Sequence, residues 1–220
     1  MAVLHRLAAI LAGLAGLMFA LVPVLHPPNT IVGALQPAWL PVHLAWLVSY
    51  LLILFALPTL FLAASQTPTG SPATTATSAL PLTGFLLAFT GTALSIPIAT
   101  YDTYIVPTLA ADAPPLIAFI NQTVEEPAIT AFHATYYLAI ATFSLGFILL
   151  GIALSRVPGL PRWAGPLMAV GAPLFWIGVG FRGLGERESF VTMAGAILFG
   201  AGLMVVGQGI ARKTVLRTED

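Results

Sequence analysis

Long runs of apolar residues alternate with short polar segments along this chain of 220 residues. A helix crosses the hydrocarbon core of a bilayer with about 20 apolar residues, and six apolar runs come close to that length or exceed it. The runs cover residues 3–24, 39–64, 80–101, 128–154, 164–181 and 190–210. This pattern predicts an all-α protein in which residues 1–220 form a single domain, an integral membrane bundle of six transmembrane helices.

The first run also has one feature of a secretory signal peptide, because Arg6 lies ahead of an apolar stretch. The length of that stretch favours a membrane span instead. In addition, no small-x-small cleavage pattern precedes the polar segment 27–29. We therefore expect the first run to be a transmembrane helix.

Two of the connections between runs are long enough to describe. Residues 65–79 contain mainly Thr, Ser, Pro and Ala and no charge, which predicts a flexible cytoplasmic loop. Residues 102–127 form the long outer loop, in which Pro114 and Pro115 open a short amphipathic helix at the interface. At its end, the acids before Pro127 are typical of a helix N-terminus.

The basic residues predict the orientation of the bundle, because cytoplasmic loops are enriched in Lys and Arg. With the N-terminus inside, six of the eight basic residues are cytoplasmic: Arg6, Arg156, Arg162, Arg212, Lys213 and Arg217. Six of the eight acids then lie outside: Asp102, Asp112, Glu125, Glu126, Glu186 and Glu188. We expect a cell-membrane protein whose N and C termini are both cytoplasmic.

The composition supports membrane insertion and excludes several classes of site. Hydrophobic residues make up 58% of the chain and charged residues only 7%, against about 25% charged in soluble domains. The net charge of zero excludes nucleic acid as a partner bound through a basic patch. Because the chain has no cysteine, disulfides and thiolate metal sites are excluded as well.

Small and aromatic residues suggest how the helices pack. Ala9, Gly13 and Gly16 in the first run, with Ala196 and Gly200 in the last, would let helix backbones approach closely. Aromatic residues near the predicted helix ends are typical of interfacial belts. They are Trp39, Trp46, Tyr101, Tyr104, Trp163 and Trp176.

The candidate chemistry lies at the outer rim of the bundle, where four helices bring imidazoles and carboxylates to one level. The candidate metal ligands are His26, His43, Asp102, Glu125, Glu126 and His133. Imidazole and carboxylate groups bind zinc, copper or non-haem iron. Tyr136 and Tyr137 follow His133 by three and four residues, so they are candidate hydrogen-bond partners, and Arg182 is a candidate partner for an anionic ligand. Such a metal site would face the extracytoplasmic side, and it would support chemistry on a lipid-soluble substrate.

Several alternatives stay open from the sequence. Haem b could take His43 and His133 as axial ligands. The histidines and acids could instead have structural roles at the interface, in a non-catalytic subunit or scaffold that packs with a membrane-protein partner or as a homo-oligomer. A substrate transporter is less favoured, because no ionisable residue falls at a predicted midplane.

Four short segments together resemble parts of known proteins: His26-Pro27, PVHL at 41–44, YDTYIVPTLA at 101–110 and LPRWAG at 160–165. They are similar to segments of small, multi-pass, uncharacterised bacterial membrane proteins. The resemblance implies a six-helix fold. It implies no activity, cofactor or catalytic residue.

Overall fold

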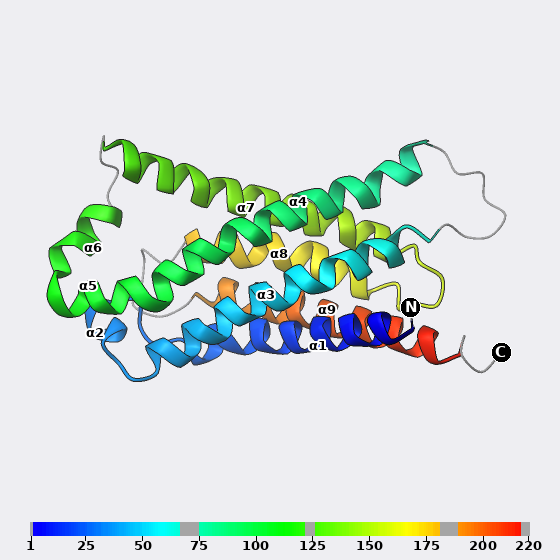
Figure 1. The fold of residues 1–220 in the computed structure, drawn as a ribbon, viewed down its shortest axis with the longest axis horizontal. Coiled ribbons are helices and arrows are strands. Elements are labelled where there is room, and N and C mark those ends of the chain that lie inside the picture. Colours follow the sequence, from blue (N-terminus) through cyan, green and yellow to red (C-terminus); the bar gives the residue numbers. More distant parts are fainter. Residues whose placement is uncertain (1, 67–74, 122–125, 181–188, 217–220) are drawn as a thin grey trace.

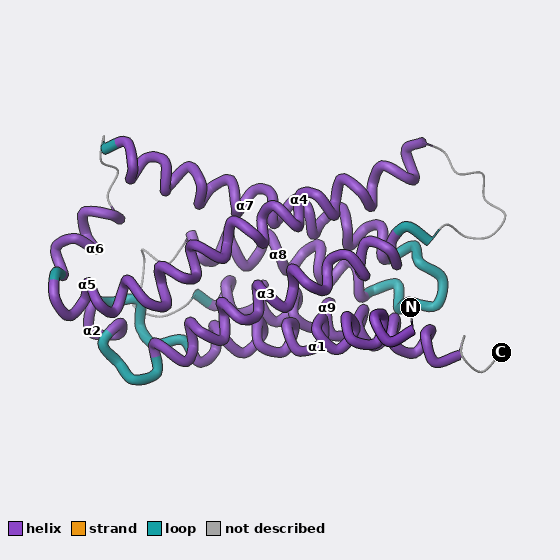
Figure 2. The backbone as a smooth tube through the Cα atoms, in the orientation of Figure 1, coloured by secondary structure: helices purple, strands orange, loops and turns teal. Residues whose placement is uncertain are grey.

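The structure is a computed structural model, and it describes residues 2–66, 75–121, 126–180 and 189–216. Within these ranges the chain forms helices joined by turns (Figures 1 and 2), which confirms the all-α prediction. The helices are α1 (Ala2–Leu25), α2 (Ile31–Ala34), α3 (Trp39–Ala64), α4 (Thr75–Thr100), the π-helix η1 (Tyr101–Ile105), α5 (Val106–Asp112), α6 (Pro114–Asn121), α7 (Pro127–Leu154), α8 (Ala164–Gly180) and α9 (Phe190–Leu216).

Among the described residues, five helical segments are long and apolar enough to cross a membrane, with mean hydropathies between 1.7 and 2.4. They lie in α1, α3, α7 and α9 and in the continuous helix that joins α4, η1 and α5. The remaining long helix, α8, has 17 residues and therefore spans about 26 Å, somewhat less than the ~30 Å hydrocarbon core. The helices suit a lipid bilayer, whereas six spans and the orientation stay predictions.

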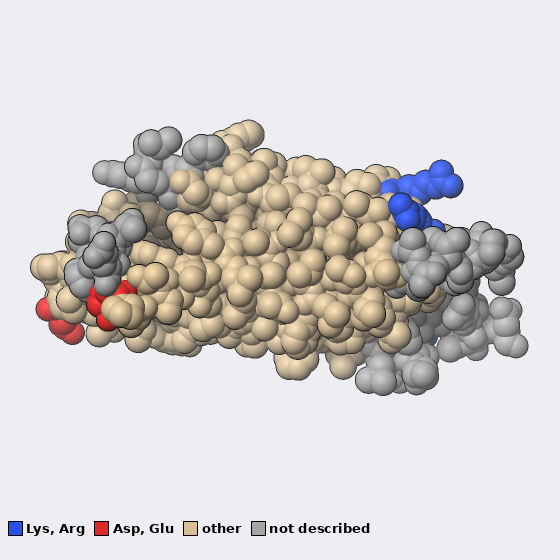
Figure 3. Space-filling model, turned by 90° about the horizontal axis from the view of Figure 1, so that it is seen from above, with Lys and Arg blue, Asp and Glu red and all other residues tan. Residues whose placement is uncertain are grey.

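The charged side chains gather at the two ends of the bundle (Figure 3). On the face shown, acidic side chains lie at one end, basic side chains lie at the other, and uncharged residues cover the body between them. We call these the acidic end, with Asp102, Asp112 and Glu126, and the basic end, with Arg6, Arg156, Arg162 and Arg212. Helix α1 begins and α9 ends at the basic end (Figure 1).

The third apolar run continues as a helix beyond its predicted end at residue 101. It passes through η1 into α5 and ends at Asp112. The hydroxyls of Thr100 and Thr103 donate to the carbonyls of Ile96 and Ala99, so these polar residues are satisfied within the helix. Pro107 has no N–H for the Thr103 carbonyl and its ring crowds that carbonyl, which a wider π turn accommodates.

The connection over 102–127 is thus mostly helical in the described residues. The amphipathic helix predicted from Pro114 is present as α6. The predicted start of α7 is also confirmed, because the Glu126 carboxylate accepts a hydrogen bond of 2.9 Å from the Ile129 amide. Of the predicted loop 65–79, α4 occupies the part from Thr75 onward, and residues 67–74 lie outside the described ranges.

The six long helices pack in a closed cycle in chain order: α1 on α3, α3 on α4, α4 on α7, α7 on α8, α8 on α9, and α9 on α1. Five fully buried phenylalanines fill the centre: Phe19, Phe143, Phe147, Phe175 and Phe199. The ring of Phe19 lies 4.9 Å from those of Phe175 and Phe199. Transport along the bundle axis would require this cluster to move, so the centre does not favour the transporter alternative.

Glycines set the closest helix contacts, as the small residues of the first and last runs predict. A Cβ atom added to Gly16 of α1 would collide with the carbonyl oxygen of Gly200 in α9, and the reverse also holds. The carbonyl of Ala9 lies similarly close to Gly207. By contrast, Gly13 has open space where its side chain would be. The α1–α9 contact therefore depends on Gly16 and Gly200, whereas a side chain at Gly13 would meet open space.

Candidate functional site

A cavity of about 720 Å³ lies at the acidic end, between α3, the α4–η1–α5 helix, α7 and α8. Its wall is rich in aromatic side chains: Trp39, Trp46, Tyr50, Tyr101, Phe132, Tyr136, Tyr137 and Trp176. The polar residues of the wall are Asn29, Thr30, His43, Ser95, Asp102 and His133. The cavity therefore combines flat apolar surfaces with a few polar groups, as sites for small molecules do.

One face of α3 supplies four of the lining residues. Trp39, His43, Trp46 and Tyr50 recur at spacings of four, three and four, so they fall on one side of the helix. All four are buried. The predicted interfacial roles of Trp39, Trp46 and Trp176 are therefore wrong, because all three indoles are buried in the bundle. The spacing on α3 is the sequence signal that could have revealed this face.

His26 and His43 are in direct contact. Their Nε2 atoms lie 3.1 Å apart, although the two residues are 17 positions apart in the chain. His26 follows the end of α1 and His43 lies in the second turn of α3, which packs against α1. His43 is only 3% exposed. The prediction that these two imidazoles lie at one level is confirmed, because the two side chains touch.

Backbone carbonyls fix the orientation of both rings. Nδ1 of His43 lies 2.9 Å from the Trp39 carbonyl oxygen, and Nδ1 of His26 lies 2.6 Å from that of Pro27. A carbonyl oxygen only accepts hydrogen bonds, so both Nδ1 atoms carry protons. In a neutral imidazole the other nitrogen then has a lone pair. If both rings are neutral, two Nε2 lone pairs face each other across 3.1 Å, and if one ring is protonated, its Nε2 donates to the other.

Trp39 connects this histidine pair to Asp102. Its indole ring stacks on the His43 imidazole with centroids 4.0 Å apart, and it meets His26 edge-on at 5.5 Å. Its Nε1 donates a 2.8 Å hydrogen bond to the backbone carbonyl of Asp102 in η1. Trp39 therefore links the backbone of Asp102 to His43, and Asp102 lines the same cavity.

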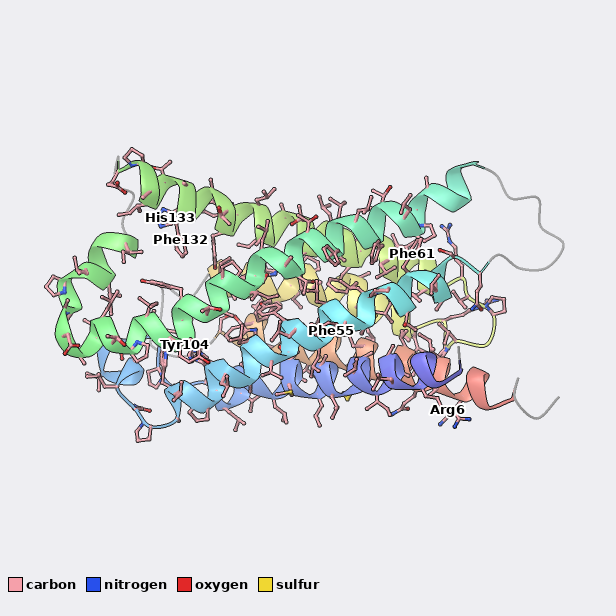
Figure 4. All side chains as sticks on the ribbon, viewed as in Figure 1. Arg6, Phe55, Phe61, Tyr104, Phe132 and His133 are labelled. Carbon is pink, nitrogen blue, oxygen red and sulfur yellow. The ribbon has the colours of Figure 1, made fainter. Side chains whose placement is uncertain are left out.

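His133 lies on another wall of the cavity. Its Nε2 lies 2.9 Å from the carbonyl oxygen of Ile120, so that nitrogen donates to α6. Phe132 and His133 project from α7 on the side that faces α6 (Figure 4). Tyr136 and Tyr137, the predicted partners of His133, also line the cavity.

Among the described residues, no group of three or more His, Asp and Glu side chains is close enough to hold a metal ion. Glu126 caps α7, and Glu125 and Arg182 lie outside the described ranges. That the six rim residues bind a metal together stays a prediction. Axial ligation of haem b by His43 and His133 would require both Nε2 atoms to leave the partners described above.

Three buried polar atoms have no hydrogen-bond partner in the described structure: Thr92 Oγ1, Tyr101 Oη and Trp176 Nε1. Two of the three belong to side chains of the cavity wall, Tyr101 on η1 and Trp176 on α8. Both are hydrogen-bond donors. Neither atom has accessible surface, so neither donor faces the cavity, and an enclosed polar group without a partner costs about 1–3 kcal/mol.

Comparisons with protein-family models, with curated proteins and with solved structures found no match. The fold is that of a helical protein whose apolar helices suit multi-pass insertion in a membrane.

Proposed function

We propose that this protein is a multi-pass membrane protein that binds one metal ion through His26 and His43, beside the cavity at the acidic end. The observation that supports the proposal is the contact between the two Nε2 atoms at 3.1 Å. Two neutral imidazoles with protonated Nδ1 atoms repel each other at that distance. A cation between the Nε2 atoms removes the repulsion, and the cation is either a proton or a metal ion.

The orientation of the rings is the one that metal-binding histidines have. A histidine that binds a metal almost always donates its other ring N–H to a carboxylate, a backbone carbonyl or water. His26 and His43 both have this arrangement, with the Pro27 and Trp39 carbonyls as acceptors. The backbone thus selects for both rings the tautomer in which Nε2 is the ligand.

The distance between the nitrogens also fits a shared metal. With zinc–nitrogen distances of ~2.0–2.1 Å, a separation of 3.1 Å corresponds to an N–Zn–N angle of about 100°. That angle lies between the octahedral and tetrahedral values. Imidazole suits zinc, copper and iron alike, so the pair does not choose among them.

In the described structure no third His, Asp or Glu side chain is close enough to complete a metal site with the pair, so Asp102, whose backbone Trp39 holds, would have to move toward the pair to become a third ligand. A carboxylate there would balance part of the metal's charge. The coordination positions of the metal that His26, His43 and Asp102 do not occupy would face the cavity. The metal would then activate water or mediate electron transfer on a lipid-soluble substrate. With the predicted orientation, this site is extracytoplasmic.

His133 provides the matched control. It is also a histidine of the cavity wall, but its Nε2 donates to the Ile120 carbonyl. We would purify the protein in mild detergent, record its visible spectrum and measure bound metals by mass spectrometry. The proposal expects one metal ion per chain, lost in His26→Ala and His43→Ala and retained in His133→Ala.

Two results would overturn this proposal. A folded, colourless and metal-free protein that does not take up added zinc, copper or iron would mean that the pair shares a proton, and would leave the scaffold role as the account of the chain. A Soret band that disappears in both His43→Ala and His133→Ala would favour haem b instead.

A further inference from the structure

From the cavity wall we infer a second property, which does not depend on a bound metal: the cavity binds an organic cation of the quaternary ammonium class. The inference combines the aromatic lining of the wall, its single negative charge and its size. The volume of about 720 Å³ lies within the ~300–1,000 Å³ that is typical of small-molecule sites.

Aromatic rings in contact with one another line the α7, α8 and α3 sides of the cavity. The ring of Tyr136 on α7 meets that of Trp176 on α8 edge-on, with centroids 5.8 Å apart. The fully buried ring of Phe175 supports this wall, because it lies 5.0 Å from the Trp176 ring and 5.6 Å from the Trp46 ring of α3. The imidazole of His43 continues the row at 6.2 Å from Trp46. Three helices thus hold one connected aromatic surface at the cavity.

The π-helix η1 completes the circuit from α3 back to α7. Trp39 of α3 donates to the Asp102 carbonyl of η1. The neighbouring Tyr101 ring lies 5.4 Å from the ring of Phe132 on α7. Phe132 precedes Tyr136 by four residues, so both lie on the same side of α7. Side-chain contacts therefore join all four helical segments of the wall into an aromatic cage.

An aromatic cage favours a cation, because the face of an aromatic ring carries partial negative charge. Cages of this kind recognise quaternary ammonium ligands. A quaternary ammonium group has no N–H, so it leaves no donor unpaired among the rings. A primary ammonium group has three donors, and each donor that the rings leave without an acceptor costs free energy.

The charge of the wall also favours a cation. Asp102 is the one formally charged side chain among the described lining residues, and none of them is Lys or Arg. Asp112 and Glu126 lie at the same end of the bundle. A cleft with one sign of charge and low-dielectric walls raises the local concentration of ligands of the opposite charge. An anionic ligand would meet Asp102 and no opposite charge from these residues.

Three probes of related structure separate the possibilities: choline, its neutral isostere 3,3-dimethylbutan-1-ol, and phosphocholine, the headgroup of a lipid. Binding is measured in a nonionic detergent as a saturable change of tryptophan emission in the Trp163→Phe background, where the three remaining tryptophans all line the cavity. The protein is first treated with a chelator, because a metal ion at His26 and His43 would repel a cationic probe.

We expect choline to bind about tenfold or more tighter than 3,3-dimethylbutan-1-ol, because its charge is attracted by the ring faces and by Asp102. Choline should also bind tighter than phosphocholine, whose phosphate would meet Asp102. This order of affinities would assign the site to a free organic cation and not to a lipid headgroup.

Variants of the wall complete the test. Asp102→Asn and Tyr136→Leu are each expected to weaken choline binding about three- to tenfold, whereas Tyr136→Phe keeps the ring and should bind choline like the wild type. Asp112→Asn at the same end and Tyr104→Leu in the same π-helix alter residues outside the lining and should leave the affinity unchanged. The His26→Ala variant should also bind choline, so failure of the metal proposal and failure of this one are distinguishable.

Three results would overturn the inference. They are equal binding of choline and 3,3-dimethylbutan-1-ol, tighter binding of phosphocholine than of choline, and an unchanged choline affinity in the Asp102→Asn/Tyr136→Leu double variant.

Discussion

The indole ring of Trp39 lies 4.0 Å from the imidazole ring of His43, and the two planes differ by only 22°. One turn of α3 separates the two residues, so the helix itself aligns the rings. The Trp39 carbonyl also accepts from His43 Nδ1, while the Trp39 Nε1 donates to the Asp102 carbonyl. A single residue therefore orients one histidine of the pair and joins it to the backbone of Asp102.

This relationship predicts that Trp39→Phe weakens metal binding without preventing it. Phenylalanine keeps an aromatic face against His43 but loses the N–H that holds Asp102. Loss of such a supporting hydrogen bond typically reduces metal affinity 10–100-fold, and we expect about tenfold here. A competition titration against a chelating dye would measure it. Trp163→Phe, at the exposed tryptophan of the basic end, is the control, and an unchanged affinity in Trp39→Phe would show that Trp39 has no positioning role.

We predict that Glu126 stabilises the folded protein and does not bind the metal. Its carboxylate caps α7 by accepting from the Ile129 amide, and loss of an N-cap costs about 0.5–2 kcal/mol. Glu126→Ala should therefore lower the thermal unfolding temperature while the metal content stays that of the wild type. A loss of bound metal at unchanged stability would return Glu126 to the set of ligands.

Substitution of the two glycines of α1 by alanine should change the free energy of unfolding in opposite directions. Gly16→Ala places a methyl group against the Gly200 carbonyl of α9, and overpacking of this kind costs about 1–3 kcal/mol. Gly13→Ala meets open space, so the higher helix propensity of alanine should stabilise the protein by up to about 1 kcal/mol. Unfolding in detergent, followed by circular dichroism, measures both. Equal effects of the two substitutions would contradict the α1–α9 contact.

The absence of cysteine makes the predicted orientation directly testable. Asp112 at the end of α5 and Ser65 after α3 are both exposed and lie at opposite ends of the bundle. With the acidic end outside, a membrane-impermeant maleimide should label Asp112→Cys in intact cells, and Ser65→Cys only after lysis. The reverse labelling would invert the topology, and labelling of both in intact cells would mean that the bundle does not span the membrane as predicted.

Helix positions were predictable because the length of an apolar run is enough to define a helix in a bilayer. The run 39–64 coincides with α3, and the start and end of α7 differ from the predicted run by no more than one residue. The end of the third run was not predictable in this way, because Asp102 and the two flanking tyrosines resemble an interfacial helix end. Threonine hydroxyls and a π turn before Pro107 instead extend the helix to Asp112.

The candidate site was predictable only in part, since depth follows from sequence position whereas the rotation of a helix does not. Depth alone placed His26, His43, Asp102 and His133 at one end. Rotation and packing decide that His26 and His43 touch and that His133 donates to α6. The same limit explains why the interfacial role predicted for Trp39 and Trp46 was wrong. Both have the depth expected of interfacial residues, but their side chains turn into the bundle.

The coordination of the metal tests the central claim most directly. Zinc-loaded protein in detergent would be studied by X-ray absorption at the zinc edge, as wild type, His26→Ala and His133→Ala. We predict two imidazole nitrogens at ~2.0–2.1 Å in the wild type and in His133→Ala, and either no bound zinc or zinc with at most one imidazole in His26→Ala. A spectrum without imidazole ligands, or one that does not change in His26→Ala, would contradict the claim that His26 and His43 hold a metal together.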